Sequence, residues 1–307
     1  MSPEPSVGLH IGLPKTATTS LQELVFARHP QIEYYGQTNL WDSADAKSLL
    51  RALLLDDEPA DAARAALNRA VAERGAVMIS DEALSMGEFM LRATRWPVSS
   101  DHARTARRAR GLIGDAHVFL VLRNQADWLE SWHRQGLKTG KYAETRFARW
   151  LERDLGAAAS RLYELLRYDR LYHAWADAFG PERVHVSLYE EYSARFPDLA
   201  VTMVEAIGAD GNRARTLAES EPRNVTGAVF QGLPPLLQHF VRSRPGQRML
   251  RVVRNRPRQV IRGLFERRRT YPGIGKADRQ RIRQHFAESN AALFQELGIE
   301  DRGFGYT

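Results

Sequence analysis

The sequence predicts an α/β fold in which helices flank a parallel sheet, followed by a mainly helical C-terminal part. Four short apolar runs predict strands, at residues 7–13, 76–79, 118–122 and 184–189. Patterns with helical spacing separate these runs, and strands that alternate with helices are typical of parallel sheets. The runs are almost continuously apolar, which indicates a sheet covered by helices on both faces.

The helices are expected from apolar spacing and from the residues at their ends. After the first strand, Leu21, Leu24 and Val25 share one helical face, and the hydroxyl residues before them suit a first turn. The remaining helical patterns cover residues 43–74 as two alanine-rich helices broken near Glu58-Pro59, and residues 126–135, 144–178, 197–207 and 276–297. Gly75 is expected to end the second alanine-rich helix, because glycine adopts the left-handed conformation common there.

Composition sets broad limits on the class of protein. The chain has 307 residues, of which 43% are apolar, and we predict one domain across residues 1–307. It has no cysteine, which excludes disulfides, a cysteine nucleophile and thiolate metal sites. We see neither a secretory signal nor an apolar run of membrane-spanning length, so a cytoplasmic location is expected. The Ala/Arg/Asp-rich usage suggests a bacterial source.

The positive charge is local. Residues 242–269 hold eleven arginines and one acidic residue, a local charge of +10, which leaves −3 for the rest of a chain whose net charge is +7. The high pI is therefore a property of one segment, and we do not predict nucleic acid as a partner.

A phosphate-binding loop is expected directly after the first strand. The segment 13–20 places Lys15 and several hydroxyl residues between a buried strand and the start of a helix, where free N–H groups and the helix dipole attract anions. Gly8 and Gly12 have neither the Walker A spacing nor the dinucleotide-binding spacing. Two later strands lead to Glu82 and Arg123, and because ligands bind at the carboxyl ends of parallel strands, we expect these residues and Lys15 to converge.

The chain here resembles the sulfotransferases that use 3′-phosphoadenosine 5′-phosphosulfate (PAPS), whose loop reads Pro-Lys-Thr-Gly-Thr-Thr. The resemblance implies a P-loop-like sheet, PAPS as the donor and no metal. It assigns the donor loop to Pro14, Lys15, Thr16, Ala17, Thr18 and Thr19, with Ala17 where the family has glycine. It also implies that Arg123 and Ser131, eight residues apart, hold the 3′-phosphate, since a guanidinium fork suits a phosphate.

The resemblance also indicates a catalytic base. In the branch that resembles heparan sulfate and other carbohydrate sulfotransferases, a glutamate after the second strand is the base, and Glu82 stands there, with Asp81 as its competitor. The cytosolic branch uses a histidine instead. Of the histidines, His10 lies inside a strand and His133 follows Ser131 on the same helix, and neither is a strong candidate.

The arginine-rich segment has several possible roles, and the sequence does not decide between them. Arg267, Arg268 and Arg269 resemble in position the family's basic lid over the donor phosphates. The stretch 252–265 has a basic amphipathic pattern that fits peripheral contact with an anionic membrane, an anionic acceptor, or a solvated helix face.

The function we expect is transfer of a sulfuryl group from PAPS to a hydroxyl or amine of a carbohydrate, lipid or natural product. One alternative is a P-loop kinase that uses Mg-ATP, in which Asp81 would hold magnesium at the end of an apolar strand. The other is a non-catalytic module that binds an anionic lipid or glycan through residues 242–269. No motif indicates the oligomeric state.

Overall fold

The computed structural model describes residues 6–36, 43–55, 60–86, 101–138, 144, 146–155, 158–220, 271 and 273–307. The arginine-rich segment 242–269, with the expected lid residues 267–269, lies outside the described residues. The chain divides into two compact units, Met1–Asn124 with Tyr163–Asn224 and Phe286–Thr307, and Gln125–Leu162 with Val225–His285. The single domain expected from the sequence stays a prediction.

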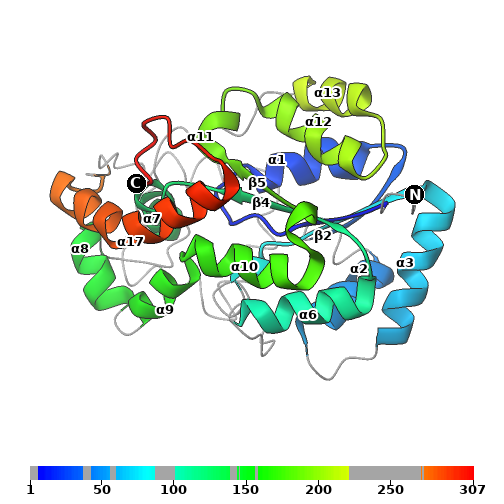
Figure 1. Ribbon diagram of the computed structural model, residues 1–307, viewed down its shortest axis with the longest axis horizontal. Coiled ribbons are helices and arrows are strands. Elements are labelled where there is room, and N and C mark those ends of the chain that lie inside the picture. Colours follow the sequence, from blue (N-terminus) through cyan, green and yellow to red (C-terminus); the bar gives the residue numbers. More distant parts are fainter. Residues whose placement is uncertain are drawn as a thin grey trace, which may run out of the picture. The chain divides into compact units, whose positions relative to one another are not determined.

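The first unit contains a five-stranded sheet (Figure 1). Its strands are β1 (Val7–His10), β2 (Ile32–Gly36), β3 (Ala76–Ser80), β4 (His117–Leu122) and β5 (Val184–Leu188). All neighbouring strands are parallel, in the order β2-β3-β1-β4-β5. The predicted parallel α/β sheet is thus confirmed. After β1, in the centre, the chain forms β2 at one edge and then β3 between β2 and β1, and it later adds β4 and β5 on the other side of β1. This order makes a switch point beside β1.

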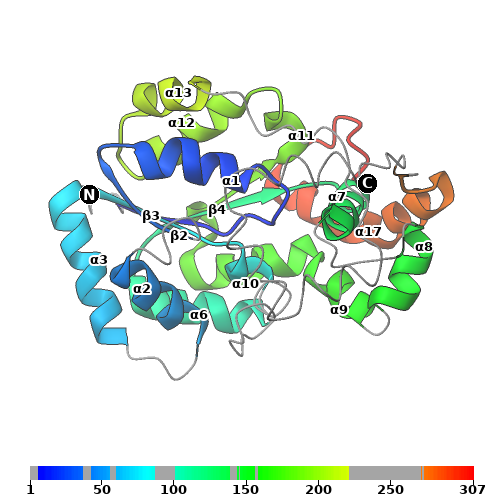
Figure 2. The ribbon, with the colours of Figure 1, turned by 180° about the vertical axis from the view of Figure 1, so that it is seen from behind.

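Helices of the first unit cover both faces of this sheet (Figures 1 and 2). One face carries α1 (Thr18–Ser20) with its helical continuation Leu21–Val25 and Phe26–Arg28, then α12 (Phe196–Ala206) and α13 (Gly211–Glu219). The other face carries α2 (Ala44–Leu54), α6 (His102–Ile113) and α10 (Tyr168–Phe179), and α3 (Ala60–Arg74) packs beside α2 and β2. The short elements are α4 (Ala83–Met86), α11 (Tyr189–Tyr192) and the turn Pro181–Arg183.

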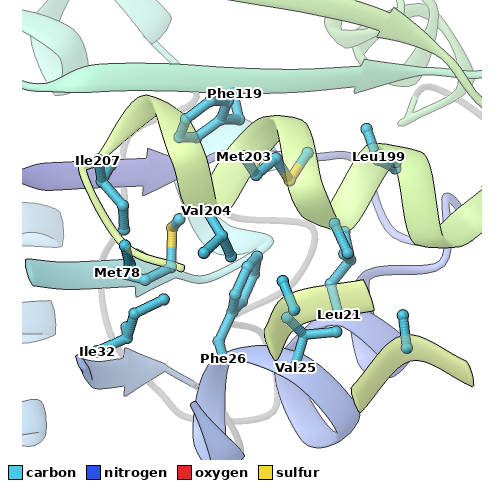
Figure 3. Close-up of a cluster of buried hydrophobic side chains, with 14 of the residues drawn as sticks. Leu21, Val25, Phe26, Ile32, Met78, Phe119, Leu199, Met203, Val204 and Ile207 are labelled. Carbon is cyan, nitrogen blue, oxygen red and sulfur yellow. The ribbon is translucent and has the colours of Figure 1, made fainter. Parts of the chain in front are cut away.

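One apolar core joins the sheet to the helices of the first face (Figure 3). Phe26, Met78, Phe119, Met203 and Ile207 meet there, each at most 2% exposed. Burying side chains of this size stabilises the fold by roughly 1.5–3 kcal/mol each. The core therefore fixes β2, β3 and β4 relative to the helix that follows β1.

The sequence predicted some elements and missed others. Gly75, with φ of 87°, ends α3 in the left-handed conformation as expected. The strand β2 and the helices α6 and α13 were not predicted; β2 is short, and Glu33 interrupts its apolar run. The single helical pattern at 144–178 is four pieces in the structure, namely α8 (Phe147–Arg149), a π-helical turn at Trp150–Leu155, α9 (Ala158–Leu165) and α10.

The second unit is mostly helical in its described residues. It holds α7 (Gln125–Lys138) and the first part of α17 (Lys276–Leu297), whose bounds match the sequence prediction. His133 of α7 is buried, stacks on Trp150 at 4.6 Å and bonds through Nδ1 to the Tyr271 hydroxyl at 2.9 Å. Its Nε2 bonds to the Glu144 carbonyl at 2.7 Å. Both ring nitrogens of His133 are thus engaged in hydrogen bonds within the unit, which agrees with the expectation that His133 is not a strong candidate for the base.

Candidate active site

Three charged residues follow three adjacent strands of the first unit. Lys15 lies five residues after the end of β1, Glu82 two residues after β3, and Arg123 directly after β4. These strands are neighbours in register, since His10 pairs with both Ser80 and Phe119. The convergence expected from the sequence is therefore confirmed at the carboxyl edge of the sheet.

The loop after β1 is held by a backbone hydrogen bond to β4 and by one of its own hydroxyls. The Ile11 N–H donates to the Phe119 carbonyl at 3.0 Å, and the buried Thr16 hydroxyl donates to the Leu13 carbonyl at 2.6 Å. Two residues have left-handed backbones, Lys15 with φ of 72° and Ala17 with φ of 67°. Ala17 thus has the conformation that the family's glycine adopts freely, and a side chain there costs roughly 1–2 kcal/mol.

The carboxylate of Glu82 contacts this loop directly. The Thr18 hydroxyl donates a short hydrogen bond to Glu82 Oε1. Burial raises the pKa of Glu82 to about 7; the hydrogen bond from Thr18 opposes this, the charge of Asp81 adds to it, and the charge of Lys15 opposes it. A carboxyl group with a pKa near neutrality can take and release a proton at physiological pH, as a general base must.

Asp81 has a different environment from Glu82. Its Oδ1 accepts the Ala83 N–H at 2.7 Å, so this carboxylate caps α4. Burial raises the pKa of Asp81 to about 6, and the hydrogen bond from Ala83 opposes that rise. Between the two candidates that the sequence left open, the contacts favour Glu82 as the base, because Asp81 is engaged with the backbone.

His10 is packed beneath the loop. Its Nδ1 lies 2.7 Å from the Ser80 hydroxyl, which also accepts from Gln22 Nε2 at 3.0 Å. Burial lowers the pKa of His10 to about 4, so the ring is neutral. A Cβ on Gly12 would lie 2.6 Å from His10 Nε2, and Gly12 is therefore required by the histidine two residues before it. The sequence did not reveal the contact between His10 and Gly12, because the pattern of apolar residues in a strand does not show which side chains lie against the following loop.

Arg123 is held from two sides and has an unused donor. Its Nη1 donates to the Lys15 carbonyl at 2.8 Å, and its guanidinium lies 4.5 Å from the centroid of the Tyr189 ring. Its Nε is buried without a hydrogen-bond partner, and the guanidinium makes no ion pair with any residue that the structure describes. A partly buried guanidinium with a buried, unpartnered Nε and no carboxylate favours an incoming anion over a structural ion pair.

Of the other residues expected to bind the sulfuryl donor, the structure describes some and not others. Pro14 and Thr18 are buried, Lys15 is partly exposed, and Thr19 is exposed at the start of α1. Ser131 lies partly exposed on α7 in the second unit, so its pairing with Arg123 stays a prediction. Arg267, Arg268 and Arg269 lie outside the described residues, and their role as a lid stays a prediction as well.

Comparison with known families bears on this geometry. The family model described as "Sulfotransferase domain" matches residues 9–201, which include the loop after β1, Glu82 and Arg123. The chain belongs to the sulfotransferase domain family. It is accordingly a transferase enzyme, as the resemblance implied, and the kinase and the non-catalytic module are set aside. A closer relation to the heparan sulfate branch stays a prediction.

One solved structure agrees with this chain in fold. A crystal structure of a sulfotransferase from Alicyclobacillus acidocaldarius aligns over 98% of this chain and 99% of that one, with a TM-score of 0.55 and 14% identity. The sulfotransferase domains of a Synechococcus olefin synthase and of the curacin biosynthetic pathway give TM-scores of 0.41 and 0.43, at 15% and 11% identity. Their alignments cover 93% and 98% of this chain and 95% and 99% of theirs. No curated protein sequence matches the chain.

The described residues form neither a metal-binding cluster nor a helix fit to cross a membrane. Within the described ranges, no cluster of three or more histidine, aspartate or glutamate side chains is placed to hold a metal ion. In the same part of the chain, no helix combines the length and apolar character that a membrane crossing requires. The expectation that catalysis needs no metal stays a prediction.

Proposed function

We propose that this sulfotransferase uses PAPS as its donor and transfers the sulfuryl group to a hydroxyl or amine with Glu82 as the base. The observation that carries the proposal is the contact between the Thr18 hydroxyl and Glu82, which joins a carboxyl of near-neutral pKa to the loop that resembles the family's donor loop. The base and the donor loop are thereby parts of one structure, as in-line transfer requires.

In the reaction, Glu82 removes the proton from the acceptor as the acceptor oxygen or nitrogen forms a bond to sulfur. The bond between sulfur and the 5′-phosphate oxygen breaks, and adenosine 3′,5′-bisphosphate leaves with that oxygen negatively charged. The Lys15 ammonium and the loop N–H groups stabilise this charge, a contribution of about 3–4 kcal/mol per donor in other enzymes. A positioned base contributes about 100- to 10,000-fold.

Arg123 is the proposed ligand of the donor's 3′-phosphate. Its buried Nε, which has no hydrogen-bond partner, supports this role. The Tyr189 ring under the guanidinium and the Lys15 carbonyl at Nη1 orient the arginine before any ligand binds. A preoriented guanidinium loses little conformational entropy when an anion arrives, so binding is tighter than with a free side chain.

The acceptor is proposed as a small molecule, glycan or lipid. A hydroxyl or amine is the group required, since Glu82 can deprotonate either as the bond to sulfur forms. Peripheral contact with an anionic membrane through residues 252–265 stays part of this proposal for a lipid acceptor.

Calorimetry with adenosine 3′,5′-bisphosphate tests the donor assignment. We expect binding that does not need magnesium, that is stronger than binding of adenosine 5′-monophosphate, and that is lost in Arg123→Ala. Arg195→Ala is the matched control, because Arg195 is exposed and pairs with Glu191 on the surface. Binding of ATP with strict magnesium dependence, in place of the bisphosphate, would contradict the proposal.

A further inference from the structure

The carboxylate of Glu190 joins two distant segments of the first unit. The Asn124 backbone N–H donates to Glu190 Oε1 at 2.8 Å, and the Tyr306 hydroxyl donates to Glu190 Oε2 at 2.6 Å. Glu190 lies in α11, directly after Tyr189, whose ring packs under the guanidinium of Arg123. One side chain thus connects the end of β4 to the segment 301–307.

The same segment also holds the side chain of Asn124. Asn124 Nδ2 donates to the carbonyls of Phe304 at 3.2 Å and Gly305 at 2.6 Å, and Asn124 is only 1% exposed. Asn124 therefore has its backbone held by Glu190 and its side chain held by the segment 301–307. A buried amide with these partners has little freedom to rotate.

The residue fixed in this way is the neighbour of Arg123. The Arg123 carbonyl accepts the Tyr168 hydroxyl at 2.5 Å, so the peptide that joins Arg123 to Asn124 is bonded on both its C=O and its N–H. None of these bonds involves the guanidinium of Arg123, which leaves that group available for a ligand.

Segment 301–307 is itself rigidly anchored. Asp301 Oδ2 accepts the N–H groups of Tyr306 and Thr307, both at 3.0 Å, and Asn290 Nδ2 donates to the Tyr306 carbonyl at 2.8 Å. The Tyr306 ring is 1% exposed and packs against Phe294, with centroids 5.1 Å apart. Burial raises the pKa of Tyr306 well above its usual value, so the phenol keeps the proton that it donates to Glu190.

We propose that Tyr306, acting through Glu190 and Asn124, is a positioning residue for Arg123 and thereby sets the affinity of the enzyme for the 3′-phosphate of its donor. This inference rests on the proposed role of Arg123 as the 3′-phosphate ligand. Tyr306 touches no reacting atom in this scheme. Its loss therefore changes how well the donor binds and leaves the chemical step intact.

The test is Tyr306→Phe, which keeps the ring on Phe294 and removes only the hydroxyl. Calorimetry should show that adenosine 3′,5′-bisphosphate binds about tenfold more weakly, while adenosine 5′-monophosphate, which lacks the 3′-phosphate, binds as in the wild type. The KM for PAPS should rise by a similar factor with kcat unchanged. Glu190→Gln, which keeps an oxygen for the Asn124 N–H, should lose less affinity than Glu190→Ala.

Arg302→Ala is the matched control, because Arg302 lies in the same segment but is exposed and pairs with Glu191. We expect it to bind both nucleotides as the wild type does. The inference is overturned if Tyr306→Phe binds the bisphosphate with wild-type affinity, or if it weakens both nucleotides equally, as a general loss of structure would. A wild-type enzyme that does not distinguish the two nucleotides would instead refute the proposed role of Arg123, and the inference with it.

Discussion

Thr18 and Glu82 are 64 residues apart in the sequence, yet the hydroxyl of the first donates directly to the carboxylate of the second. Thr18 begins the helix after the loop, and Glu82 follows the strand beside β1. The bond lowers the pKa of Glu82 against the larger effect of burial. The loop therefore influences the proton affinity of the proposed base as well as its position.

The first prediction concerns pH. Glu82 acts as a base when it is deprotonated, and its pKa is raised to about 7, so kcat should fall as the pH drops through about 7. Thr18→Val removes a hydrogen bond that lowers the pKa of Glu82. The pH at which kcat falls should therefore be higher in this variant by about one pH unit. The measurement is kcat at saturating donor from pH 5.5 to 9. An unshifted profile in Thr18→Val would show that Glu82 does not control the rate.

A second prediction separates the two neighbouring acids. Glu82→Gln should lower kcat by at least about 100-fold, because the base is removed while its shape is kept. Asp81→Asn keeps an oxygen for the Ala83 N–H and should retain most of the activity. Steady-state assays at pH 8 decide the matter; the reverse order of activities would make Asp81 the base.

The same Glu82→Gln variant should be more stable than the wild type at high pH. The folded pKa of about 7 lies above the ordinary value of 4.5, so the wild type loses stability as the pH rises from about 4.5 to about 7 and does not regain it above. The neutral amide avoids this cost, and we expect a gain of about 1–3 kcal/mol in unfolding free energy at pH 8. Denaturant unfolding at pH 4 should show no such gain, and a gain of equal size there would contradict this account.

The third prediction concerns Lys15. Lys15→Ala should lower kcat by about 100- to 1,000-fold at saturating donor, since the charge that builds on the leaving phosphate oxygen loses a stabilising cation. Lys47→Ala, on the exposed side of α2, serves as the control and should leave kcat unchanged. A Lys15→Ala enzyme with wild-type activity would contradict the assignment of the loop after β1 as the donor-binding loop.

The fourth prediction concerns the left-handed backbone of Ala17. Glycine adopts this conformation without steric cost, so Ala17→Gly should raise the unfolding free energy by about 0.5–1 kcal/mol and keep the activity. Ala65→Gly, at an exposed position inside α3, should lower it by about 1 kcal/mol. Thermal unfolding of both variants gives the comparison, and equal losses of stability would mean that Ala17 is not strained.

Part of this protein could be predicted because its signals are local. The buried strands are continuous apolar runs, and the loop after β1 is a contiguous motif, so the positions of Lys15, Glu82 and Arg123 at strand ends followed from the chain itself. In a parallel sheet the carboxyl ends of the strands share one edge, which made their convergence predictable. The short strand β2 and the division of the 144–178 pattern lacked such signals, since five residues with an internal glutamate carry little periodicity.

By itself, the sequence determined the α/β class, the position of the loop after β1 and the set of charged residues at the sheet edge. Only the tertiary structure decided how those residues are used: that Asp81 caps α4, that Arg123 has no carboxylate partner among the described residues, and that Tyr306 reaches Glu190. The physical reason is the distance along the chain over which each kind of interaction acts. Apolar periodicity and turn residues act over a few positions, whereas hydrogen bonds between residues far apart depend on strand order and register, which the whole fold sets.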